Sequence, residues 1–162
     1  MNLKIATMED FNEVKEMALE FLKESPYANY PKDITKVDNI IFSFLLDKEL
    51  NNNKERVCLL AIPKGSNKPI GIIAGYTTEA LFTNQKVATE VMWWVYPEHR
   101  GRSRASIELL QAFEHWASMV GSSYVQMASL ASLDDSRGIV EKIYKKFGYK
   151  TTEINYIKEI NN

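Results

Sequence analysis

Residues 87–106, VATEVMWWVYPEHRGRSRAS, join a strand to a helix through a turn of unusual composition. The segment 87–96 is rich in β-branched and aromatic residues, which favours a strand, and Pro97 ends it. A helix from near Gly101 to Gly121 follows, with apolar residues at helical spacing on one face. Such a turn leaves the first amides of the helix unpaired, and the helix dipole adds partial positive charge there. The small residues at 101, 103, 105 and 106 would let a ligand approach the backbone. We therefore expect a binding site for a pyrophosphate or another polyanion.

The charge of this turn supports the same interpretation. Three of the five arginines in the chain, Arg100, Arg102 and Arg104, fall within it. The alternative is a solvated basic helix N-terminus, but positive charge there opposes the helix dipole and needs a reason.

The remaining elements follow from hydrophobic periodicity and turn residues. Strands are predicted at 2–6, 56–63, 69–78, 87–96, 124–127 and 154–157. Helices are predicted at 11–22, 37–50, 101–120 and 139–147, and a polar loop passes through Asp134 and Asp135. Three consecutive strands predict an antiparallel meander, and 87–128 predicts a parallel crossover. The expected fold is α/β, with a single mixed, mostly antiparallel sheet flanked by helices.

Length and composition limit the functional classes. The chain has 162 residues, 45% hydrophobic content and a formal net charge of -1, so we expect a single domain over 1–162 and no general nucleic-acid binding. The one cysteine, Cys58, and two histidines argue against a disulfide framework and a metal centre. We expect no signal peptide, no membrane span and a cytoplasmic location.

Two motifs carry a family resemblance. Residues 95–105 resemble motif A of the GCN5-related N-acetyltransferases (GNAT), whose pattern is Gln/Arg-x-x-Gly-x-Gly/Ala. Arg100, Ser103 and Ala105 occupy its defined positions, and Ser103 departs from the usual glycine. Residues 144–149, Tyr-Lys-Lys-Phe-Gly-Tyr, resemble the family's Tyr-x-x-x-Gly-Phe/Tyr ending of its last helix. The predicted element order also matches that fold, with its splayed central strand pair, from residue 1 to about 160.

The resemblance implies direct acetyl transfer from acetyl-coenzyme A (acetyl-CoA) to a primary amine on a small molecule or a protein, without a metal. The backbone amides of the motif A turn would hold the pyrophosphate: Arg100, Gly101, Arg102, Ser103, Arg104, Ala105 and Ser106. Backbone groups of Trp94 and Val95 would pair with the pantetheine arm, as an added strand does.

Two side chains are candidates for the proton transfers. Glu90 lies where some family members place a catalytic glutamate and would take a proton from the amine. The alternative is a solvent-facing residue or a lysine partner. Tyr144 matches the tyrosine that protonates the sulfur of coenzyme A in many family members, and the alternative is a core tyrosine with a satisfied hydroxyl.

The sequence leaves three matters open. The transferred group could be another acyl group, or the chain could be a catalytically degenerate GNAT-fold binding or structural module. Ser103 supports the second alternative, and so do Arg137 and Val140, which replace the Asn and Ala that often precede the family tyrosine. Tyr27, Tyr30 and Phe82 could select the acceptor or simply cover the sheet. A homodimer also stays open.

Overall fold

The computed structural model describes residues 1–130, 137–158 and 160. It divides into two compact units, Met1–Ala128 and Ser129–Asn162.

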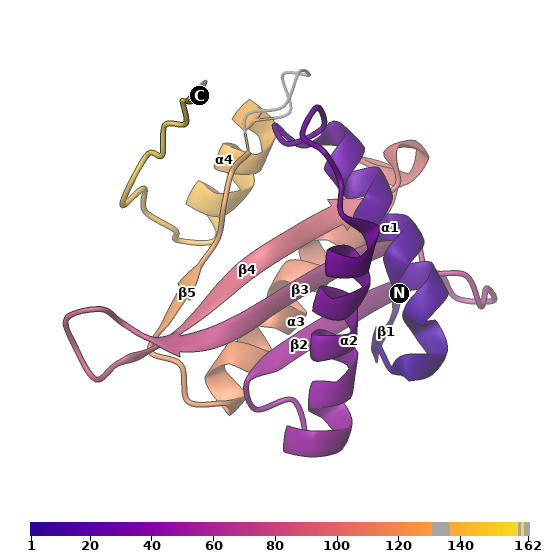
Figure 1. Ribbon diagram of the computed structural model, residues 1–162, viewed down its shortest axis with the longest axis horizontal. Helices are drawn as coiled ribbons and strands as arrows, with labels where there is room; N and C mark the ends of the chain where they lie inside the picture. The colour runs from indigo at the N-terminus through magenta and orange to yellow at the C-terminus, as the bar shows by residue number, and fades with distance from the viewer. Residues whose placement is uncertain (131–136, 159, 161–162) are drawn as a thin grey trace. The chain divides into compact units, whose positions relative to one another are not determined.

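The first unit is built on one five-stranded sheet (Figure 1). Its strands are β1 (Asn2–Ile5), β2 (Arg56–Ile62), β3 (Gly71–Glu79), β4 (Lys86–Val95) and β5 (Tyr124–Gln126), in that spatial order. The first four pair antiparallel, and β5 pairs parallel to β4. This arrangement confirms the predicted meander, the parallel crossover and the mixed, mostly antiparallel sheet.

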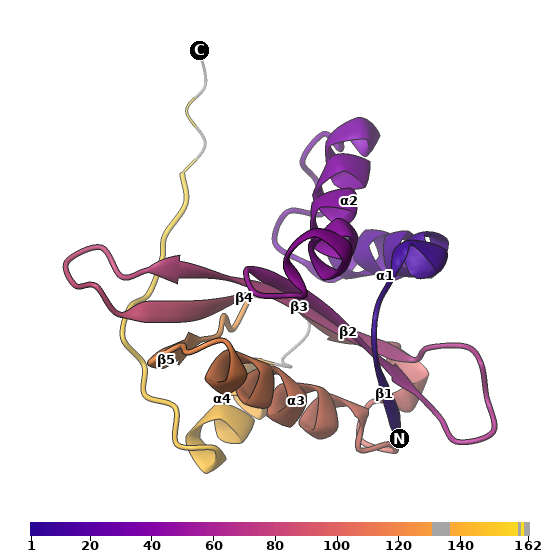
Figure 2. The ribbon, with the colours of Figure 1, turned by 90° about the horizontal axis from the view of Figure 1, so that it is seen from below.

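Helices cover both faces of this sheet (Figure 2). On one face lie α1 (Phe11–Glu24) and α2 (Ile34–Asn51), and on the other lies α3 (Ala105–Met119). Because successive strand residues point to opposite faces, the core consists of two clusters. Leu60, Ile72 and Trp94 belong to the cluster under α1 and α2, whereas Leu59 and Ile73 belong to the cluster under α3.

A β-bulge interrupts the pairing of β3 with β4. Gly75 lies opposite Glu90 and Ala74 lies opposite Met92, so Val91 is the extra residue. A Cβ on Gly75 would come within 2.5 Å of the Phe113 ring and of the Thr89 carbonyl oxygen, so this position admits only glycine without rearrangement. Bulges of this kind re-aim side chains and are common beside active sites.

Two single-turn 3₁₀ helices lie before α1 and α3: Met8–Asp10 and Pro97–His99, respectively. The Asp10 carboxylate accepts from the amide of Thr7 at 2.9 Å and so caps the first of them. The predicted start of α3 near Gly101 is wrong by four residues. Gly101 has φ +69°, which no helical residue adopts, and the turn therefore continues to Arg104.

The second unit contains α4 (Arg137–Lys146), which confirms the last predicted helix within two residues. Gly148, with φ +85°, ends it, and the amide of Tyr149 donates to the carbonyl oxygen of Tyr144 at 3.0 Å. The predicted strand at 154–157 is wrong: these residues form no strand, and Ile154, Tyr156 and Ile157 are 59, 92 and 70% exposed. The predicted loop at Asp134 and Asp135 lies outside the described residues.

Candidate functional site

The first feature of the site is the outer edge of β4, the edge that faces away from β3. The ladder with β5 covers only Val87–Thr89 and ends there in the described part of the chain. The amide of Tyr96 donates to the Ile70 carbonyl at 3.0 Å, and backbone groups alternate in direction along a strand. Trp94 therefore directs its backbone groups at β3, whereas Val95 directs its own toward the outer edge. The Val95 carbonyl accepts from Nε of Arg100 at 2.7 Å.

The second feature is the turn between β4 and α3. It consists of the 3₁₀ helix Pro97–His99 and residues 100–104, and it runs directly into the first turn of α3. Within the residues that the structure describes, the amides of Gly101, Arg102, Arg104 and Ser106 have no hydrogen-bond acceptor. They lie at the positive end of the α3 dipole, which favours an anion.

Ser103, which replaces the family glycine, is folded back onto the turn. Its hydroxyl donates to the His99 carbonyl at 2.9 Å, and its oxygen accepts from the amide of Ala105 at 3.4 Å. One amide of the turn is therefore partly engaged by a side chain.

Arg100 is engaged in holding the turn to its neighbours. Its Nη2 lies 2.7 Å from Oε2 of Glu24 at the end of α1, and its guanidinium lies 5.7 Å from the centroid of a Trp94 ring. By contrast, Arg102 and Arg104 are exposed, and only a long 3.9 Å contact joins Arg104 to Glu108. The charge available to an anion comes from these two arginines rather than from Arg100.

Glu90 is a buried carboxyl on the same face of β4 as α3. Its Oε2 accepts from the amide of Ala128, just after β5, at 3.2 Å. Burial raises the pKa of Glu90 to about 7, and the bond from Ala128 acts in the opposite direction. The alternative of a solvent-facing Glu90 is wrong. A carboxyl with this pKa exchanges protons near neutral pH, which suits a general base.

Trp93 and Trp94 point to opposite faces of the sheet, because they are neighbours on a strand. Trp94 is buried under α1 and α2 and meets the Tyr96 ring at a centroid distance of 4.6 Å. Trp93 packs against the cluster under α3.

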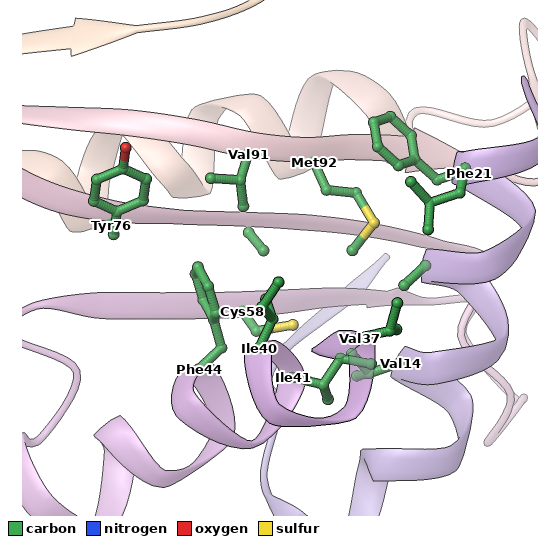
Figure 3. A pocket seen from close by; sticks show the side chains of 13 residues that line it. Val14, Phe21, Val37, Ile40, Ile41, Phe44, Cys58, Tyr76, Val91 and Met92 are labelled. Atoms are coloured by element: carbon green, nitrogen blue, oxygen red, sulfur yellow. The ribbon is translucent and has the colours of Figure 1, made fainter. Parts of the chain in front are cut away.

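A third feature, which the sequence did not reveal, is a cavity of about 330 Å³ between α1, α2 and strands β2–β4 (Figure 3). We call it the apolar cavity. Its lining is hydrocarbon except for the sulfur atoms of Cys58 and Met92 and the hydroxyl of Tyr76: Val14, Ala18, Phe21, Leu22, Val37, Ile40, Ile41, Phe44, Cys58, Ala74, Tyr76, Val91 and Met92. Tyr27, Tyr30 and Phe82, which could select the acceptor or cover the sheet, are exposed and lie outside this lining. The helical spacing of apolar residues in α1 and α2 predicts which face of each helix is buried, but it does not predict the cavity that these faces enclose with the sheet.

Tyr144 belongs to the second unit. It lies in the last turn of α4, and its ring centroid is 5.4 Å from that of Tyr149. Glu90, Val95 and residues 100–106 all belong to the first unit.

In the described part of the chain, no group of three or more His, Cys, Asp or Glu side chains is placed to hold a metal ion. In the same part of the chain, none of the helices has the length and apolar character that crossing a membrane requires.

Comparison with known proteins gives structural matches only. No family model and no curated protein matches the chain. A probable acetyltransferase of solved structure matches with a TM-score of 0.73 at 18% identity, over 100% of this chain and 99% of its own. AAC(6')-Iy, solved with the bisubstrate analogue CoA-S-monomethyl-acetylneamine, matches with a TM-score of 0.70 at 14% identity, over 99% and 98%. Ribosomal-protein-alanine N-acetyltransferase from Brucella melitensis biovar Abortus 2308 gives 0.67 at 15% identity, over 99% and 100%.

These similarities extend over whole chains but at low identity, so they establish the fold and not the substrate. This shared fold agrees with three features of the chain: the mixed sheet, the parallel β4–β5 pair and the turn before α3. The chain therefore has the fold of the GCN5-related N-acetyltransferases.

Proposed function

We propose that the chain transfers an acetyl group from acetyl-CoA to the primary amine of a small molecule or a protein. The observation that carries this proposal is one continuous backbone surface. The outer edge of β4 ends at Val95, and the turn that follows presents amides without acceptors at the start of α3.

In this proposal the donor lies along that surface. The pyrophosphate binds the amides of residues 100–106, with charge from Arg102 and Arg104, and the pantetheine arm pairs with the outer edge of β4. Val95 keeps the role that the resemblance implies. The backbone groups of Trp94 point at β3, so they are not available to the pantetheine arm. Its side chain takes part instead, because the ring lies against the guanidinium of Arg100. The amide of Val95 lies on the correct edge to donate to the thioester oxygen as negative charge develops there.

Glu90 is the proposed base. The carboxylate takes a proton from the ammonium group, and the neutral amine attacks the thioester carbon. The new C–N bond forms as the C–S bond breaks, and the electron pair leaves on sulfur. With a pKa near 7, Glu90 accepts a proton more readily than an exposed carboxylate does, and burial keeps water away from it.

Tyr144 is the proposed acid that protonates the departing thiolate. This assignment comes from the motif that spans Tyr144 to Tyr149, whose helix end is formed as the motif requires. Tyr144→Phe should lower kcat by at least about tenfold with KM for acetyl-CoA unchanged, because only the proton donor is removed. Full turnover in this variant would remove Tyr144 from the mechanism.

A matched pair of glycine variants tests the donor site. Gly101 and Gly65 both have left-handed φ angles, +69° and +82°, and a Cβ on either meets nothing within 4 Å. An alanine at either position should cost about 1–2 kcal/mol of stability through backbone strain alone. Only Gly101→Ala distorts the proposed pyrophosphate turn, whereas Gly65 lies in the turn between β2 and β3.

Calorimetry with acetyl-CoA should show at least tenfold weaker binding for Gly101→Ala and unchanged binding for Gly65→Ala. Equal affinities in the two variants would place the donor elsewhere. A thiol-release assay over a panel of amines then measures turnover. Binding without release on any amine would favour the degenerate module, and release with longer acyl donors alone would favour transfer of another acyl group.

A further inference from the structure

The side chain of Arg100 joins the turn after β4 to the rest of the first unit. In the described part of the chain, every other hydrogen bond of residues 97–104 stays within the turn or runs to Tyr96 or to the first turn of α3. The Arg100 guanidinium instead donates from Nε to the Val95 carbonyl at 2.7 Å and from Nη2 to Oε2 of Glu24 at 2.7 Å. One side chain therefore fixes the turn both to β4 and to α1.

The geometry of this link suits an arginine. Nε and Nη2 lie on one edge of the planar guanidinium, so the group donates to both acceptors at once. The ring of Trp94 lies against the same group, with its centroid 5.7 Å from Cζ, and restricts its orientation. A lysine ammonium is a point charge on a flexible stem and has no fixed fork with which to hold two acceptors at set positions.

The charges of Arg100 and Glu24 are each unfavourable for the helix beside them. Glu24 is the last residue of α1, where a carboxylate opposes the helix dipole, and Arg100 lies in the turn before α3, where a cation does the same. The two side chains are 41 and 39% exposed, and an ion pair this exposed contributes little to stability. Helix stability therefore does not account for the pair, whereas the position of the turn does.

A second contact joins α1 to the same region. Tyr96, the residue before the turn, donates from its hydroxyl to Oε1 of Glu16 at 3.0 Å. Burial and the bond to the Glu16 carboxylate raise the pKa of Tyr96 to about 12, so the phenol keeps the proton that it donates. Glu16 and Glu24 are about two helical turns apart on α1. The helix therefore contacts the start of the turn directly and, through Arg100, its middle.

We propose that Glu24 is a positioning residue for the acyl donor: through Arg100 it holds the turn of residues 100–104 at the end of β4. The inference rests on the proposed function, in which the donor contacts the outer edge of β4 and the amides of the turn at the same time. Such a donor binds more tightly when both parts are held in place beforehand, because less conformational freedom is lost on binding. The Val95 carbonyl can still accept from the pantetheine arm, since a carbonyl oxygen has two lone pairs.

Calorimetry with acetyl-CoA on Glu24→Ala and Glu20→Ala tests the assignment. Glu20 lies on the same helix and pairs with Lys23 of α1, so its replacement removes a carboxylate and an ion pair that do not contact the turn. Glu24→Ala should bind acetyl-CoA about three- to tenfold more weakly, whereas Glu20→Ala should bind it as the wild type does. Equal affinities in the two variants would overturn the proposal.

A purely structural role of Glu24 would change different quantities. The melting temperature of Glu24→Ala should not fall below that of the wild type, because the variant loses a carboxylate that opposes the dipole of α1. In steady-state kinetics KM for acetyl-CoA should rise while kcat stays unchanged, because Glu24 does not contact the reacting atoms. A lower melting temperature with unchanged affinity, or a lower kcat with unchanged KM, would overturn the positioning role.

Two further variants show whether Glu24 acts through Arg100. Glu24→Gln, whose amide oxygen can still accept from Nη2, should recover part of the affinity. Glu24→Ala should weaken binding much less in an Arg100→Lys background than in the wild type, because the link is already broken. The same loss in both backgrounds would overturn the route through Arg100. If the wild type itself takes up no acetyl-CoA, the proposed donor site is wrong and the inference fails with it, before any variant is compared.

Discussion

Both parts of β4, Val87–Thr89 and Glu90–Val95, pair with β3 on one edge, but only the first part pairs with another strand on the opposite edge. Val87–Thr89 pairs with β3 and with β5, so its backbone is satisfied by strands on both edges. Beyond Thr89 the ladder with β5 ends, although β3 continues to pair as far as Val95. The change coincides with the bulge at Val91 and with the buried Glu90. One strand is therefore paired on both edges in its first part, and in its second part it has the free outer edge along which we propose that the donor binds.

Glu90→Gln should produce the largest effect if the second part of β4 is catalytic. A glutamine keeps the shape and can still accept from the amide of Ala128 but cannot take a proton. We expect kcat to fall by about 10²–10⁴-fold, and the limb of the pH–rate profile near pH 7 to disappear. If steady-state kinetics gives an unchanged pH–rate profile, Glu90 is not the base, and the second part of β4 loses its proposed catalytic residue.

The same variant should change stability in the opposite sense. The folded pKa of Glu90 is raised from 4.5 to about 7, so wild-type stability is complete below pH 4.5 and declines as pH rises through 7. Because glutamine never ionises, Glu90→Gln should be more stable than the wild type at pH 8, by no more than about 3 kcal/mol. Urea unfolding at pH 8 and pH 4.5 measures the difference, which should vanish at the lower pH. A variant that is less stable at pH 8 would show that the carboxylate is stabilised where it lies.

Gly75→Ala tests whether the bulge separates the two parts. The new Cβ would meet the Phe113 ring and the Thr89 carbonyl, so unfolding free energy should fall by about 2 kcal/mol. Gly138→Ala on α4 is the comparison: its Cβ meets nothing within 4 Å and its φ is not left-handed, so this change should leave stability unchanged or raise it by up to about 1 kcal/mol. Denaturant titration compares them. If Gly75→Ala and Gly138→Ala unfold with equal free energies, the bulge tolerates a side chain and the close packing of Gly75 against Phe113 does not hold it in place.

Ser103→Ala should give the smallest effect. Removal of the hydroxyl frees the Ala105 amide for a phosphate oxygen, so coenzyme A should bind about two- to fivefold more tightly. Ser43→Ala is the control, because its hydroxyl also donates to a helix carbonyl but lies on α2. Weaker binding in calorimetry would instead show that the Ser103 hydroxyl itself contacts the diphosphate.

Local sequence signals predicted most of the first unit. Alternating apolar residues, helical spacing and the breaks at Pro97 and Gly121 placed its strands and most helix ends within a few residues. The strand at 154–157 was mispredicted because alternation describes a strand only where a partner edge buries one face, and these side chains are exposed. The candidate residues of the turn also followed from local composition.

Features that depend on register could not be predicted. The bulge at Val91 arises from how β3 meets β4, and it decides which side chains line the cavity. The direction of the Trp94 backbone depends on the pairing of Tyr96 with Ile70, and the burial of Glu90 depends on the end of β5. No pattern within one segment specifies these relations.

The most direct test is a titration of the ¹⁵N-labelled protein with coenzyme A, followed by amide chemical shifts. The amides of Val95, Gly101, Arg102, Arg104 and Ser106 should show the largest changes, and those of Val87–Thr89 should change little. If the largest changes fall outside the outer edge of β4 and the following turn, the coenzyme does not bind there and the proposed donor site is wrong.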